Sequence, residues 1–133
     1  MVKRLRHALP RRLLGFTLIE LLIVLAIIAV LLTLVAPRYW GQVDTAKEAV
    51  LRENLRVTRD AIGKFYADSG RFPDSLEELV STRYLAQKPF DPITDSSDTW
   101  TLEPVPEGLQ GSVYDLHSGA ATKARDGTPY AQW

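Results

Sequence analysis

The stretch RRLLGFTLIELLIVLAIIAVLLTLVA, residues 11–36, decides the fold of this chain. Its apolar part runs from Phe16 to Ala36, 21 residues in all. The polar members of that run are Thr17, Glu20 and Thr33. As a helix the run would be about 32 Å long, which matches the hydrocarbon thickness of a bilayer. The sequence therefore predicts one membrane-spanning helix near the N-terminus.

Basic residues are distributed unevenly around the apolar run. The first 15 residues carry five positive charges and no acidic residue, whereas the rest of the chain has 11 basic and 16 acidic residues. Because short flanks rich in Lys and Arg stay in the cytoplasm, we expect Met1 inside and Trp133 outside. The acidic balance of the exported part argues against nucleic-acid binding.

The chain contains no cysteine, which excludes disulfides, thiolate catalysis and cysteine-ligated zinc. Roughly 97 residues follow Ala36, enough for one small domain with a thin core. An exported domain of this size must be stabilised by its helix, by a metal or by neighbouring subunits.

Two ordinary interpretations of the apolar run fit its residues less well. A secretory signal peptide ends in small residues of the A-x-A type, but this run ends in Leu34-Val35-Ala36-Pro37. A plain transmembrane anchor explains the length and the flanking charge but not Glu20. An ionised carboxylate deep in lipid costs at least about 2.5 kcal/mol, and it is usually retained for a partner. Glu20 lies only five residues into the run, which weakens this objection without removing it.

The hexapeptide Gly15-Phe16-Thr17-Leu18-Ile19-Glu20 resembles the processing motif of type IV pilins and type II secretion pseudopilins. The resemblance implies that a prepilin peptidase cuts between Gly15 and Phe16 and methylates the new amino terminus of Phe16. It also implies that Glu20 recruits the next subunit by facing a neighbour's N-terminal amine. A carboxylate and an ammonium, each costly in an apolar environment, become tolerable as a pair. One departure is Leu13-Leu14, where the family commonly has a basic residue.

Pro37 closes the apolar run and, with Gly41, predicts a kink or a local melt of the helix. The alternative is that Pro37 only marks the end of the membrane span. Beyond it, Gly70 is a helix-termination signal, so we expect one spine helix from about Phe16 to Asp68. Its second half is amphipathic, with apolar residues at steps of three and four. These are Val43, Ala46, Val50, Val57, Ala61, Ile62 and Phe65.

The segment after the spine helix has the signals of a small α+β domain. Ser75 with Glu78 forms a capping box, which predicts a short helix. Residues 99–102 and 112–116 are rich in β formers, and they predict short antiparallel strands. The expected fold class is therefore α+β, pilin-like, with the long helix packed on a small antiparallel sheet. The expected parts are a basic leader that is removed (1–15), the transmembrane half of the helix (16–36), its amphipathic half (37–69) and the globular domain (70–133).

Two further segments are similar to the major, G-type pseudopilins of type II secretion. They are Gly70-Arg71-Phe72-Pro73, followed by Leu76 and Leu79, and Pro89-Phe90-Asp91-Pro92. Pseudopilins of this type carry a calcium ion in their C-terminal loop, and calcium binds six to eight oxygen ligands. The candidates here are Asp115, Ser118 and Asp126, and no other cofactor is expected. The favoured interpretation is that Asp126-Gly127 is only a tight turn. In that case Tyr130 and Trp133 hold the C-terminal segment by packing.

Catalysis is not expected. His117 is the only histidine in the exported part, and it is flanked by Asp115 and Ser118. On a strand, Asp115 and His117 would point to one face and Ser118 to the other, which does not give a nucleophile and its base the approach geometry of a triad.

The resemblance implies a structural subunit of the bacterial inner membrane that assembles into a periplasmic pseudopilus for type II protein secretion. Its implied partners are copies of itself, sister pseudopilins, the prepilin peptidase and the inner-membrane secretion platform. A minor type IV pilin is the alternative. The absence of cysteine and the short C-terminal domain argue against it, since many type IV pilins carry a C-terminal disulfide. A single-pass, membrane-anchored periplasmic binding module is the alternative from another class.

Overall fold

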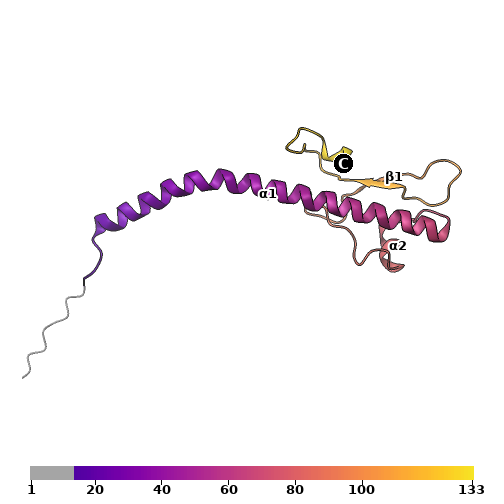
Figure 1. The fold of residues 1–133 in the computed structure, drawn as a ribbon, viewed down its shortest axis with the longest axis horizontal. Helices are drawn as coiled ribbons and strands as arrows, with labels where there is room; N and C mark the ends of the chain where they lie inside the picture. The colour runs from indigo at the N-terminus through magenta and orange to yellow at the C-terminus, as the bar shows by residue number, and fades with distance from the viewer. Residues whose placement is uncertain (1–13) are drawn as a thin grey trace, which may run out of the picture. The chain divides into compact units, whose positions relative to one another are not determined.

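The computed structural model describes residues 14–133, so most of the expected leader lies outside the described part. Its elements are α1 (Leu18–Ser69), α2 (Leu76–Ser81), β1 (Thr101–Glu103), β2 (Asp115–His117) and the 3-10 helix η1 (Tyr130–Gln132) (Figure 1). One long N-terminal helix with a two-stranded antiparallel sheet confirms the expected α+β fold.

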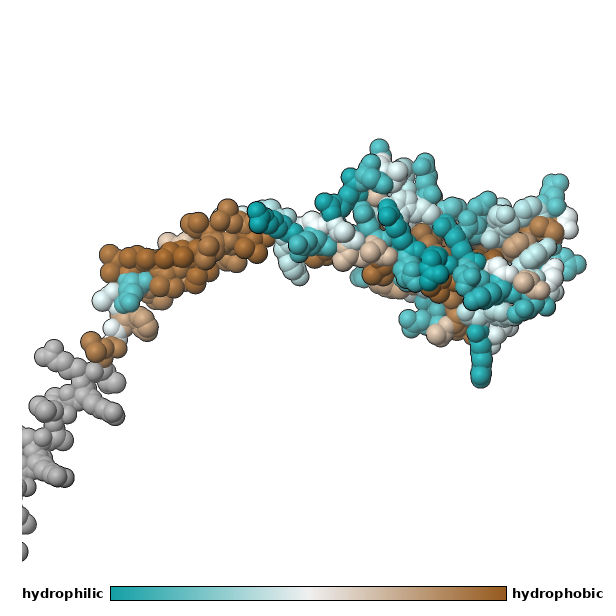
Figure 2. Space-filling model, viewed as in Figure 1, coloured by the Kyte–Doolittle hydropathy of each residue, from teal (hydrophilic) through white to brown (hydrophobic). Residues whose placement is uncertain are grey.

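The chain divides into two compact units, residues 1–39 and 40–133. In the first unit every described residue is exposed, although almost all of them from Leu18 onward are apolar. Figure 2 shows the N-terminal part of α1 as a hydrophobic surface. By length and composition α1 qualifies as a membrane-crossing helix. An apolar surface of this size is stable only in lipid or against other subunits.

The helix α1 continues through Pro37 and Gly41 without a break, so no melted segment interrupts it. Pro37 lacks an N–H and leaves the Thr33 carbonyl without its usual helical donor. The Gly41 carbonyl accepts hydrogen bonds from Thr45 Oγ1 at 2.9 Å and from Arg125 Nη1 at 3.3 Å. These two donors support the helix at its softest residue.

In the second unit one face of α1 forms the floor of the core. Its buried residues follow the helical period and are Leu51, Leu55, Thr58, Ala61, Ile62 and Phe65. The expectation that Val50 and Val57 belong to this face is wrong, because their side chains are 47% and 40% exposed. Each lies one residue from a buried position, about 100° around the helix. The spacing alone therefore placed Ala61, Ile62 and Phe65 correctly on the buried face but assigned Val50 and Val57 to that face wrongly.

The rest of the core comes from the segments that pack on this face. Its members beyond α1 are Phe72, Leu76, Leu79, Leu85, Val113, Leu116, Ala120, Ala124 and Tyr130. The sheet contributes chiefly through β2, where Leu116 is fully buried, whereas all of β1 is exposed. The two strands pair in the register Thr101↔His117, Leu102↔Leu116 and Glu103↔Asp115.

One local capping motif and one long-range contact fix the connections in this unit. The Glu78 N–H donates to Ser75 Oγ at 3.2 Å at the start of α2, which confirms the capping box. Glu78 Oε2 in turn accepts the Asp74 N–H at 2.7 Å. Asp91 is fully buried and accepts from the Ile93 N–H at 2.9 Å and from Ser118 Oγ at 2.5 Å. Asp91 therefore ties the loop after α2 to the segment after β2.

Leu116→Ala should lower the free energy of unfolding by about 2–5 kcal/mol, because its side chain is fully buried and the cavity would be lined by core residues. Leu109→Ala is the matched control: Leu109 is 45% exposed, so its loss should cost less than about 1 kcal/mol. Denaturant unfolding of the full chain in detergent, followed by tryptophan fluorescence, measures both. Equal losses for the two variants would contradict this core.

Candidate functional site

The junction of the expected leader and α1 is exposed and non-helical. Residues 14–17 precede the first turn of α1, and the Phe16 side chain is 87% exposed. A Cβ built on Gly15 meets no atom within 4 Å. The peptide bond between Gly15 and Phe16 therefore lies in accessible backbone. Such a bond can enter a protease active site without unfolding a helix.

Thr17 caps the helix that follows. Its Oγ1 accepts the Glu20 N–H at 3.2 Å, and its carbonyl accepts the Leu21 N–H at 3.2 Å. Thr17 and Glu20 thus have the spacing of a capping box, T-x-x-E, of which the structure forms the hydroxyl half. This motif was not predicted from the sequence, because its two residues lie inside the apolar run.

Glu20 lies in the first turn of α1, where the helix dipole favours a negative charge. Its neighbours on the helix surface are exposed aliphatic side chains. Within residues 14–133 no hydrogen bond or ion pair engages the Glu20 carboxylate. The helix end lowers the cost of this charge, but a complete compensation in lipid requires an opposite charge from another molecule.

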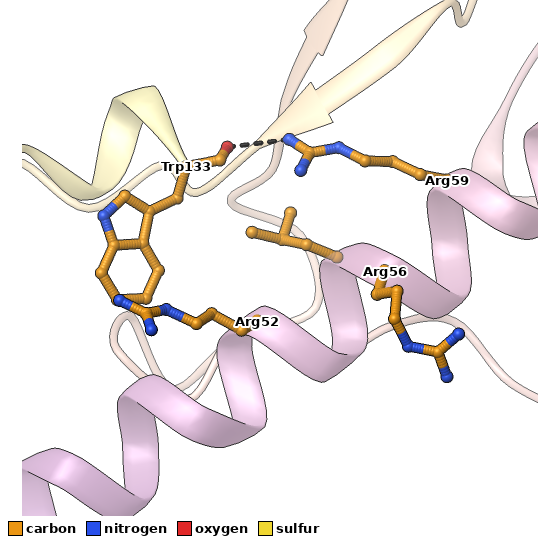
Figure 3. A pocket seen from close by; sticks show the side chains of 5 residues that line it. Arg52, Arg56, Arg59 and Trp133 are labelled. Carbon is orange, nitrogen blue, oxygen red and sulfur yellow. Dashed lines mark hydrogen bonds between the residues drawn. The ribbon is translucent and has the colours of Figure 1, made fainter.

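The C-terminal segment is fastened to α1 by aromatic and basic side chains. Tyr130 is buried, and its hydroxyl donates to Glu48 Oε1 at 3.0 Å. The Trp133 ring lies edge-on to Tyr130, and the Arg52 guanidinium stacks 4.3 Å from its centroid. Figure 3 shows Trp133 above α1 beside Arg52 and Arg59. The expectation that Tyr130 and Trp133 hold this segment is confirmed.

Arg59 joins three parts of the second unit. Its Nε donates to Asp115 Oδ1 at 2.7 Å, and its Nη2 donates to the main-chain oxygens of Leu116 and Trp133, each at 2.9 Å. The bond to Trp133 is drawn in Figure 3. The planar guanidinium can serve three acceptors at once, which a lysine ammonium on the same stem matches poorly. No local pattern in the sequence identified this residue, since its partners lie 56 or more positions away.

The three calcium candidates bond to different partners. Asp115 binds Arg59, buried Ser118 binds Asp91, and Asp126 Oδ1 accepts the N–H and the hydroxyl of Thr128 at 2.9 and 2.6 Å. Gly127 has φ +88°, so the tight turn expected at Asp126-Gly127 is confirmed. The calcium site itself stays a prediction, and these contacts give it no support.

His117 and Ser118 do not act on each other. His117 Nδ1 lies 2.7 Å from the main-chain oxygen of Trp133, and its Nε2 lies 3.3 Å from Glu103 Oε2. The Ser118 hydroxyl is committed to the buried Asp91 carboxylate. The arrangement fits the expected absence of a nucleophilic triad among these residues.

The exposed junction, the long apolar helix and the small antiparallel sheet are together the features of the pilin-like class of proteins. The model of the prokaryotic N-terminal methylation motif matches residues 11–36. Type II secretion system core protein G of Xanthomonas campestris pv. campestris is 30% identical over 122 residues, covering 86% of this chain and 80% of that protein. The chain belongs to the family of the type II secretion system core protein G.

Other comparisons agree with this assignment. Core protein G of Klebsiella pneumoniae is 27% identical over 128 residues, covering 84% of this chain and 89% of the relative. Type IV major pilin protein PilA of Myxococcus xanthus is 34% identical, but over 65 residues that cover 49% of this chain and 30% of that pilin. No solved structure gives a significant match to this chain. Because the match to the pilin covers only about half of this chain, the alternative of a type IV pilin is not favoured.

The buried tyrosine of the C-terminal segment gives a pH test. Burial raises the pKa of Tyr130 to about 12, and the hydrogen bond to Glu48 contributes in the same direction. Because the unfolded-state pKa is near 10, this group adds stability below pH ~10, which is lost as the pH rises towards 12. The pKa of Tyr84 is also raised, by its hydrogen bond to Asp68, so a phenolate absorbance titration should show Tyr130 as the latest transition, which Tyr130→Phe removes. Tyr114→Phe, at a half-exposed site, is the control. Retention of the late transition in Tyr130→Phe would contradict the assignment.

Proposed function

We propose that this chain is a structural pseudopilin that is cut between Gly15 and Phe16, N-methylated on Phe16 and polymerised into a periplasmic pseudopilus for type II secretion. The proposal rests on membership in the core protein G family and on the match to the methylation motif. The observation that carries it is the Glu20 carboxylate, which has no oppositely charged partner among residues 14–133 and lies at the start of an exposed apolar helix. A charged carboxylate in this apolar setting is costly unless a cation from another subunit pairs with it.

The proposed location is the inner membrane, with the N-terminus in the cytoplasm and the second unit in the periplasm. The charge asymmetry of the sequence supports this orientation. Residues 16–36 would span the bilayer before assembly, and removal of residues 1–15 would free the amine of Phe16. In this orientation the Gly15–Phe16 bond lies on the cytoplasmic side, where the prepilin peptidase of the family acts.

Assembly follows from one amine and one carboxylate on each subunit. The amine of Phe16 and the carboxylate of Glu20 lie on different residues, so a pair between subunits joins unlike surfaces. A contact between unlike surfaces that does not close into a ring continues as a filament. Within the apolar environment each charge is costly alone, and pairing removes most of that cost. The further proposed partners are sister pseudopilins and the inner-membrane secretion platform.

The cleavage site is tested by Gly15→Val. The substituted chain should fold as before, because no atom lies within 4 Å of the added Cβ. Its larger side chain should block the protease from the backbone, so mass spectrometry should find residues 1–15 retained in cells that contain the prepilin peptidase. The parent chain in the same cells should begin at an N-methylated Phe16. An intact parent chain in the presence of the peptidase would refute the proposal.

The assembly role is tested by Glu20→Gln, which removes the charge but keeps the size and the main-chain N–H that Thr17 caps. Filament yield, measured by sedimentation and electron microscopy, should fall at least tenfold, while cleavage continues. Thr33→Val is the control, since it removes a polar group in the same apolar run whose hydroxyl bonds only to its own helix at Val30 O. Normal filaments from Glu20→Gln would show that the pairing argument is wrong.

A further inference from the structure

Three side chains with metal-binding atoms meet on one face of the two-stranded sheet. Glu103 on β1 lies directly opposite Asp115 on β2. His117 follows Asp115 by two positions, so it emerges on the same face of the strand. One ligand atom from each of the three residues lies within 4.8 Å of the other two. The cluster forms because the two strands pair. No single short segment of the sequence contains all three residues.

The charges in the cluster are only partly balanced. Like charges directly opposite each other on paired strands are destabilising. Arg59 neutralises Asp115 through Oδ1, and its remaining bonds go to main-chain oxygens. Asp115 Oδ2 lies on the side of His117, 4.0 Å from Nε2. Within residues 14–133 the Glu103 carboxylate contacts His117 alone. With a neutral imidazole, the cluster keeps a net negative charge that a cation would offset.

The orientation of His117 identifies the nitrogen that faces the carboxylates. Its Nδ1 lies 2.7 Å from the main-chain oxygen of Trp133, and a carbonyl oxygen can only accept, so Nδ1 carries the hydrogen. In the neutral ring Nε2 then has a lone pair, and it points at Glu103 Oε2, 3.3 Å away. Two lone pairs at this distance repel unless a proton or a metal ion lies between them. Metal-binding histidines usually donate their other N–H to a carbonyl or carboxylate, as His117 does.

We propose that Glu103, Asp115 and His117 bind a divalent transition metal ion, with Zn²⁺ as the best match. Zinc accepts imidazole nitrogen and carboxylate oxygen at about 2.0–2.2 Å, which places ligand atoms roughly 3.3–3.6 Å apart in a tetrahedral site. The separations from Nε2 to the two carboxylate oxygens are 3.3 and 4.0 Å, so small side-chain rotations suffice. Calcium, by contrast, prefers six to eight oxygen ligands without nitrogen.

The surroundings suit an ion that enters from solvent. The side chains of His117 and Asp115 are 26% and 27% exposed, and that of Glu103 is 48% exposed. Three protein ligands leave the fourth zinc position to water. The ion would join β1 to β2 and, through the His117–Trp133 bond, fix the C-terminal segment. In a domain without disulfides such a link adds stability when the ligands are preorganised.

The test uses the full chain in detergent micelles after treatment with a chelator. Zinc should raise the thermal unfolding temperature and bind in isothermal titration calorimetry, and Co²⁺ should give the visible absorption of a tetrahedral site. His117→Gln and, separately, Glu103→Gln should each weaken zinc binding at least tenfold. Glu107→Gln, an exposed carboxylate outside the sheet, is the matched control and should bind zinc as the parent does.

Either ligand variant is informative even if it is less stable, because each is compared with itself with and without zinc. The proposal is overturned if zinc does not shift the unfolding of the parent chain, or if it shifts His117→Gln equally. It is also overturned if calcium raises the unfolding temperature of the parent chain as much as zinc does and has no such effect on His117→Gln. The site would then not be specific for a transition metal. If a proton, and not a metal ion, lies between His117 Nε2 and Glu103, zinc will not shift the unfolding of the parent chain.

Discussion

The core of the second unit depends on one face of α1. The paired strands are only three residues each, and β1 is exposed throughout, so the sheet alone cannot enclose a core. Two- or three-residue ladders of this kind are not stable by themselves in water. The stripe from Leu51 to Phe65 supplies the large apolar surface on which the loops, α2 and β2 pack. The helix that qualifies by length and composition to cross a membrane is thus also the main structural element of the second unit.

Polar side chains of α1 then hold in place the segments that pack on its apolar stripe. Arg59 binds β2 and Trp133, Glu48 accepts from Tyr130 and from the Arg125 N–H, and Asn54 donates to the Phe90 carbonyl at 2.6 Å. These bonds satisfy polar groups of β2 and of the loops around α1, and such groups are costly when they are buried and unsatisfied. A domain rich in loops and free of cysteine therefore keeps one arrangement because a rigid helix holds its ends.

In the first unit the apolar side chains of α1 are exposed instead of buried. There almost every side chain is apolar and exposed, and the few polar groups are handled locally: Thr33 bonds to its own helix, and Thr17 caps the first turn. Glu20 is the exception, because its charge has no local compensation among the described residues. In an apolar environment such an uncompensated charge favours association with a partner of opposite charge. In the proposed filament this carboxylate would gain the opposite charge that it lacks among the described residues.

Local patterns in the sequence determined the long apolar helix, the end of α1 near Gly70, the capping box before α2 and the turn at Gly127. Each depends on neighbours within a few residues, so periodicity, caps and turn chemistry suffice to predict it. The strands were predicted within three residues of their positions, since their composition but not their pairing is local.

Only the tertiary structure decided which face of α1 is buried, since Val50 and Val57 are as apolar as the residues beside them and the choice depends on what packs there. It alone brought Asp91 to Ser118, Arg59 to Trp133 and Glu103 to His117. These pairs are separated by 14 to 74 positions. Their formation depends on how the whole chain closes around α1, which no short window of residues contains.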